Sequence, residues 1–136
     1  PLPSHVTVKS FSHEEMQLVY KKAKIVVIGL NLKADNNDSM GTFAVAEALA
    51  MGKAVVVTKS KSLESYIEDG VSGRFVPIHD VGAMKDVITD VLGNDTKRQA
   101  LGFAAREFAV KNVDAEIFAQ KLGNYFRSLF TKNHRK

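Results

Sequence analysis

The sequence predicts an α/β fold, in which a Rossmann-like parallel sheet of about four strands has flanking helices and a helical C-terminal end. Two observations carry this prediction. Short β-branched runs of strand length alternate with helical patterns. The strand-like runs are continuously apolar, which is typical of parallel strands buried on both faces. The 136 residues suit one domain with a single core. The predicted strands are residues 5–9, 24–30, 53–58 and 73–77.

Three helices are predicted within the strand-containing part of the chain. The first has an apolar face that includes Met16 and Tyr20, and the second is almost wholly apolar. The third is short, and Gly70 follows it as a helix-ending signal. Alternation of strands with helices indicates βαβ units. The predicted ranges are residues 13–23, 42–51 and 63–68.

Three more helices are predicted after the last strand, over residues 81–92, 96–110 and 115–130. Asp95 is the expected N-cap of the second, and Asp114 precedes the third. The third helix carries an apolar stripe at helical spacing. The plain interpretation is that this stripe packs into the core, and the alternative is that it covers a partner domain. The stripe consists of Phe118, Leu122, Phe126, Leu129 and Phe130.

Composition and charge exclude several classes of function. The absence of cysteine removes thiolate metal sites and cysteine nucleophiles, and the four histidines lack metal-ligand spacing, so no metal site is expected. The net charge of +4 comes without a basic stripe that alternates with aromatic residues, which disfavours nucleic acid. The basic residues 132–136 are interpreted as a solvated end, and contact with anionic lipid or nucleic acid is the alternative. The apolar runs are too short to cross a bilayer.

A polar loop that leads into the helix at residues 42–51 is the most informative feature. Ligands of parallel α/β sheets bind beyond the carboxyl ends of the strands, where such a loop lies. The start of a helix presents backbone N–H groups that favour phosphate, and Gly41 would let an anion come close. Glu47 is the only charged residue on this helix. Its carboxylate either accepts hydrogen bonds from a vicinal diol such as ribose, or lies on an exposed stripe.

Two neighbouring stretches resemble a known family. Residues 47–58 read Glu-Ala-Leu-Ala-Met-Gly-Lys-Ala-Val-Val-Val-Thr, and residues 66–77 read Tyr-Ile-Glu-Asp-Gly-Val-Ser-Gly-Arg-Phe-Val-Pro. They resemble the C-terminal, donor-nucleotide domain of retaining GT-B-fold glycosyltransferases of the "glycosyl transferases group 1" type. The family pattern is Glu-Ala-Met-Ala-x-Gly-x-Pro-Val-Val, followed by Glu-Asp-Gly-x-x-Gly-x-Leu-Val. The resemblance implies half of a GT-B fold.

The resemblance also implies roles for individual residues. The family has two glutamates at a fixed separation. The second of them binds the ribose hydroxyls of the donor, and this glutamate corresponds to Glu47. The helix start holds the donor diphosphate and sugar, and the loop after the first predicted strand lies near the nucleobase. No metal and no cofactor are implied beyond the nucleoside-diphosphate sugar itself. The implied positions are Ser39, Met40, Gly41, Thr42 and Phe43 for the diphosphate and sugar, and Ser10, Phe11 and Ser12 near the nucleobase.

The sequence departs from the family pattern in places that matter for activity. Ser39 stands where the first glutamate is expected, and Met40-Gly41-Thr42 replaces Gly-Phe-Gly. The family's first strands of this domain and its N-terminal acceptor domain have no counterpart. We therefore expect residues 1–136 to be a single nucleotide-sugar-binding domain, truncated on its N-terminal side. The catalytic group is not identified.

The leading hypothesis is the donor-binding domain of a retaining hexosyltransferase, of the kind that builds polysaccharides, and inactive as a fragment. A non-catalytic nucleotide-binding or regulatory module is the alternative, because of Ser39. A receiver-like signalling domain is a further alternative, although the second predicted strand ends in Gly29-Leu30-Asn31 without the required aspartate. The expected partners are a nucleotide sugar and the missing acceptor domain. The parent is expected in the cytoplasm, with peripheral contact at the inner membrane face left open.

Overall fold

The computed structural model describes residues 3–30 and 41–133, and within them a three-stranded parallel sheet. The sheet has the order β1 (Ile25–Ile28), β2 (Ala54–Thr58) and β3 (Arg74–Val76). The strands are in register at Val26 with Val55 and at Val57 with Phe75. The predicted α/β class with a parallel sheet is confirmed, with three strands in the described part of the chain.

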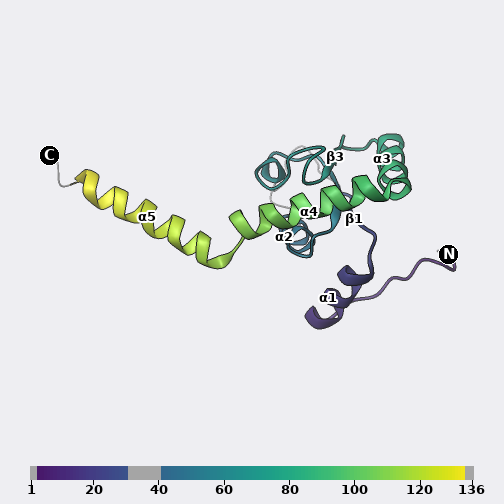
Figure 1. The fold of residues 1–136 in the computed structure, drawn as a ribbon, viewed down its shortest axis with the longest axis horizontal. Coiled ribbons are helices and arrows are strands. Elements are labelled where there is room, and N and C mark those ends of the chain that lie inside the picture. The colour runs from purple at the N-terminus through teal and green to yellow at the C-terminus, as the bar shows by residue number, and fades with distance from the viewer. Residues whose placement is uncertain (1–2, 31–40, 134–136) are drawn as a thin grey trace.

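Helices surround this sheet (Figure 1). Helix α4 (Asp95–Asn112) runs along the body, and α5 (Ala115–Asn133) extends away from it, on the side opposite the N-terminal segment. The short helix predicted at residues 63–68 is a 3-10 turn, η1, that begins and ends slightly earlier. The helices are α1 (His13–Lys22), α2 (Thr42–Ala50), η1 (Ser62–Ser65), α3 (Val81–Gly93), α4 (Asp95–Asn112) and α5 (Ala115–Asn133).

The core lies on both faces of the central strand β2. Val55 and Val57 pack on one face with α2 and part of α4, whereas Val56 packs on the other with α3. These three valines have no exposed surface. Because alternate residues of a strand point to opposite faces, a run of apolar residues is needed when both faces are covered. Burial of each valine side chain contributes about 1.5–3 kcal/mol.

The contact between α2 and α4 depends on two glycines. Gly102 of α4 lies against the backbone carbonyl of Gly52, just after α2, so closely that a Cβ atom on Gly102 would overlap the Gly52 oxygen. Arg106, one turn further along α4, donates to the Ala50 carbonyl oxygen at the end of α2. Glycine permits this approach because it has no side chain. The contact holds α2, and with it Glu47, against α4.

Side-chain caps explain where the helices begin. Ser12 caps α1 in a capping box, in which its hydroxyl accepts from the Glu15 N–H at 3.2 Å and the Glu15 carboxylate accepts from the Ser12 N–H at 2.9 Å. The prediction of Asp95 as the N-cap of α4 is wrong. Asn94 is the cap, with its side-chain oxygen accepting from the Lys97 N–H at 2.9 Å. Asparagine and aspartate are near-equal caps, so sequence preference did not distinguish these neighbours.

The strand predicted at residues 5–9 is wrong, because this segment has no strand structure. Val6 and Val8 are 42% and 80% exposed. A short β-branched run becomes a strand when a neighbouring strand pairs with it and a core covers it. Within residues 3–30 and 41–133, β1 pairs with β2 alone, and its outer edge has no strand beside it.

Candidate functional site

The start of α2 lies at the carboxyl end of the sheet, as the loop argument predicts. Gly41 is its N-cap, with φ of 82° in the left-handed region that favours glycine. A Cβ atom on Gly41 would lie 3.0 Å from the Leu30 side chain, which follows β1. The first turn of α2, with the positive end of its helix dipole, is therefore held where β1 ends. This is the position at which parallel α/β proteins bind anions.

Phe43 and Glu47 share the open side of α2. They are four residues apart, so they lie on the same helical face. Phe43 is 88% exposed and Glu47 is exposed, whereas Val45, Ala48 and Leu49 on the other side have no exposed surface. The carboxylate therefore lies on the exposed stripe of a helix whose opposite side is buried. The two sequence interpretations of Glu47 are thus compatible, because a ligand must reach it from this open side.

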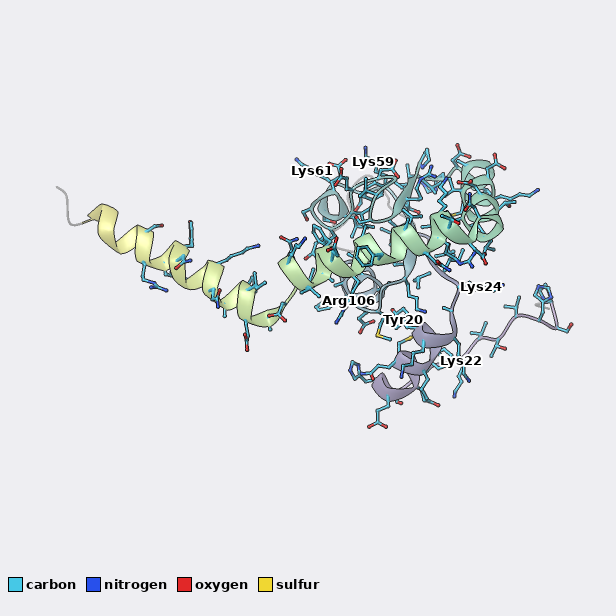
Figure 2. The ribbon with its side chains drawn as sticks, in the orientation of Figure 1. Tyr20, Lys22, Lys24, Lys59, Lys61 and Arg106 are labelled. Atoms are coloured by element: carbon cyan, nitrogen blue, oxygen red, sulfur yellow. The ribbon has the colours of Figure 1, made fainter. Side chains whose placement is uncertain are left out.

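Within the described part of the chain, Glu47 has the hydroxyl of Tyr20, in the last turn of α1, as a hydrogen-bond partner. This hydroxyl donates to Glu47 Oε2 at 3.1 Å. Tyr20 is buried, with 8% of its surface exposed (Figure 2 shows it on the side of α1 that faces the body). Burial raises the pKa of Tyr20 to about 12, and the hydrogen bond and the negative charge of Glu47 add to the increase.

A cavity of about 130 Å³ lies between α1 and the second half of α2. Its polar lining residues are His13, Gln17, Tyr20 and Glu47, and Met16 and the end of α2 complete the lining. Ligand pockets for whole small molecules are about 300–1,000 Å³. This cavity is therefore smaller than a site for a whole small molecule.

The residues expected near the nucleobase do not lie beside Glu47 in this structure. Ser12 caps the start of α1, eight residues before Tyr20, which is about 12 Å along a helix. Ser10 and Phe11 precede it and are exposed, and the Lys9 ammonium lies 5.3 Å from the centre of the Phe11 ring. Ser39 and Met40 lie outside the described residues.

A second hollow lies at the carboxyl ends of all three strands, and sequence reasoning did not single out its residues. Its volume is about 250 Å³, and Leu30, Thr58 and Pro77 line it where β1, β2 and β3 end. Thr58 is buried, and its hydroxyl oxygen accepts from the Leu30 N–H at 3.1 Å, which fastens the segment after β1 to β2. His79, also at the rim, has φ of 60°. The sequence could have indicated this hollow, because the carboxyl ends of parallel strands meet at one edge of the sheet.

Lys59 and Lys61 do not supply charge to the Glu47 region. Lys59 pairs with Glu64 at 3.2 Å, and Lys61 is exposed. Figure 2 shows both on the side of the body opposite α1 and Tyr20. Among residues 3–30 and 41–133, no group of three histidine or acidic side chains is arranged to hold a metal ion. In the same part of the chain, no helix has the length and apolar character needed to cross a bilayer.

Comparison with known proteins identifies the class of protein that this fold and site define. The family model "Glycosyl transferases group 1" matches residues 1–108, and the chain belongs to this family. A D-inositol 3-phosphate glycosyltransferase from Mycolicibacterium smegmatis is 34% identical over 87% of this chain, and one from Corynebacterium diphtheriae is 33% identical over 83%. The chain spans 25% of the length of each of these relatives.

The fold agrees with this family assignment. A sucrose-phosphate synthase from Thermosynechococcus elongatus superposes with a TM-score of 0.75, at 23% sequence identity. The superposition covers 92% of this chain and 30% of that one. The prediction of a Rossmann-like half of a GT-B fold is confirmed.

Proposed function

We propose that residues 1–136 form the donor-binding domain of a glycosyltransferase that transfers a sugar from a nucleoside-diphosphate sugar to an acceptor. The observation that carries this proposal is the placement of α2. Gly41 holds the start of this helix at the carboxyl end of β1, and Glu47 lies on its open side. Family membership supports sugar transfer as the reaction.

The proposed site has two parts, the start of α2 and the carboxylate of Glu47. Backbone N–H groups at the start of α2, around Gly41, Thr42 and Phe43, bind the donor diphosphate. They stabilise the negative charge that grows on it as the glycosidic bond breaks, because oriented dipoles act most strongly where charge develops. Glu47 accepts hydrogen bonds from the ribose hydroxyls. The retaining stereochemistry and the independence from a metal are implied by the family resemblance and are part of the proposal.

The acceptor is held by a part of the enzyme that this chain does not include. The relatives from M. smegmatis and C. diphtheriae are named for D-inositol 3-phosphate, which makes an inositol phosphate the first acceptor to test. The nucleoside-diphosphate sugar is the only small molecule that the domain itself needs. We expect the parent protein in the cytoplasm, because nucleoside-diphosphate sugars are found there.

Kinetics of the full-length protein test this function. We expect turnover of one of the uridine, guanosine or adenosine diphosphate sugars, with release of the nucleoside diphosphate. Glu47→Gln keeps the size of the side chain and removes its charge, and it should raise the KM for the donor about tenfold or more. Glu107→Gln, on the exposed side of α4, is the matched control and should leave the KM unchanged. Donor turnover with an unaltered KM in Glu47→Gln would contradict the ribose role.

A non-catalytic nucleotide-binding module is the second candidate. Ser39 motivates it, because a serine replaces a carboxylate that the family places at the donor sugar. This candidate predicts that the full-length protein binds a nucleoside diphosphate but does not consume its sugar derivative. Restoring the carboxylate with Ser39→Glu would then be expected to increase turnover if the rest of the site is intact.

A further inference from the structure

We propose that Tyr20 is a positioning residue for Glu47, and that its hydroxyl holds the carboxylate ready to accept both ribose hydroxyls of a nucleotide. This inference rests on the proposed donor-binding function. It adds a specific role for α1, a helix for which the sequence suggested only a structural face.

Tyr20 and Glu47 lie in different environments, because Tyr20 is buried and Glu47 is exposed. Tyr20 belongs to the buried core cluster that includes Val45 and Leu49, so its ring has little freedom to move. Glu47 lies on the exposed side of α2. Their contact, from the Tyr20 hydroxyl to Glu47 Oε2 at 3.1 Å, therefore links a fixed donor to a side chain that otherwise has several rotamers. A rigid donor of this kind reduces the conformational freedom that the carboxylate would lose when a ligand binds.

The hydrogen-bonding capacity of the carboxylate leaves room for the ligand. An ionised carboxylate offers about four acceptor positions. Tyr20 donates to one position on Oε2, and we assign two of the other positions to the 2′- and 3′-hydroxyls of ribose. The small cavity beside the pair, with Met16 and Met51 in its wall, matches contact with one edge of a nucleotide rather than with the whole molecule.

A structural role and a positioning role predict different ligand dependence. A buried tyrosine hydroxyl usually has a hydrogen-bond partner, so the contact would help the fold in either case. Loss of fold stability weakens the binding of all nucleotides by the same factor. Loss of carboxylate positioning weakens mainly those that carry the hydroxyl that Glu47 contacts. The preference for ribonucleotides over 2′-deoxyribonucleotides is therefore the diagnostic quantity.

The experiment compares the affinity of this chain for uridine, guanosine and adenosine diphosphates and for their 2′-deoxy counterparts, measured by amide NMR titration. Tyr20→Phe keeps the ring in the core and removes only the hydroxyl. We expect it to weaken binding of the preferred ribonucleotide about 3- to 10-fold, and that of its 2′-deoxy counterpart much less, so the preference shrinks. Glu47→Gln should change the preference in the same direction. Tyr66→Phe, at a partly buried tyrosine packed on the same core cluster, is the control and should change neither affinity.

The possible results distinguish this inference from the function on which it rests. A preference that falls in Glu47→Gln but is unchanged in Tyr20→Phe overturns the role of Tyr20 and leaves the donor site standing. A wild-type chain that binds ribo- and deoxyribonucleotides equally overturns the ribose role of Glu47 and the inference with it. Equal weakening of both ligands in Tyr20→Phe identifies a structural contact only, which also overturns the inference.

Discussion

Helices α2 and α5 are both predicted from their apolar residues, and they have opposite environments. The α2 segment is almost wholly apolar, whereas the α5 segment has one apolar stripe at helical spacing. In α2, Val45, Ala48 and Leu49 have no exposed surface, because the sheet and α4 cover them. In α5, Phe118 is 64% exposed and Phe126 is 50% exposed, and the helix extends away from the body (Figure 1). The interpretation of the α5 stripe as core is therefore wrong for these residues.

The difference shows that an apolar stripe identifies a helix but not what covers it. The helical period depends on residues within one segment, whereas burial depends on neighbours elsewhere in the chain or outside it. Helix α2 follows β1 and precedes β2, so the βαβ connection places it on the sheet. Helix α5 lies outside the described βαβ units and follows α4 through Val113 and Asp114 only.

Leucine truncation gives the largest expected contrast between the two helices. Leu49→Ala removes a fully buried side chain and leaves a cavity, so we expect the free energy of unfolding to fall by about 2–5 kcal/mol. Leu122→Ala in α5 is the matched change at a position that is 41% exposed, and we expect a loss of about 1 kcal/mol or less. Urea denaturation followed by circular dichroism measures both. Equal losses would show that α5 is packed as tightly as α2.

Alanine at Gly102 of α4 and at Gly123 of α5 should produce effects of opposite sign. Gly102→Ala places a Cβ atom against the Gly52 carbonyl oxygen, and separating α4 from α2 should cost about 1–3 kcal/mol. Gly123 of α5 has only the end of the Arg127 side chain near such an atom, at 3.7 Å. Gly123→Ala should therefore stabilise its helix by up to about 1 kcal/mol through helix propensity. Thermal unfolding of the two variants checks the signs. A stabilising Gly102→Ala would disprove the close contact.

Alkaline pH should weaken the packing of α1 on α2. The pKa of Tyr20 is raised from 10.0 to about 12 in the folded chain, mainly by burial. The neutral hydroxyl therefore contributes stability that is fully present below pH 10 and is lost as the pH rises through about 12. The free energy of unfolding should decline over this interval, and Tyr20→Phe should decline less. Parallel curves for the two proteins would show that Tyr20 ionises as it does in the unfolded chain.

Local signals predicted most of the fold, and missing neighbours explain the errors. The strands β1, β2 and β3 and the helices α1 to α5 follow from apolar runs, spacing and turn residues. The segment at residues 5–9 has the composition of a strand, yet no described strand pairs with it. The site was predicted less completely. Gly41 and Glu47 follow from a loop that enters a helix, whereas the contact of Glu47 with Tyr20 joins residues far apart in the sequence.

The most direct test of the donor site is an amide NMR titration of this chain with uridine, guanosine and adenosine diphosphates. One nucleotide should shift the signals of Gly41, Thr42 and the residues around Glu47 with a common saturating curve, while the signals of α5 stay in place. That result would locate nucleotide binding at α2 and identify the base. Unchanged α2 signals at millimolar concentrations of all three nucleotides would contradict the claim that this chain carries the donor site.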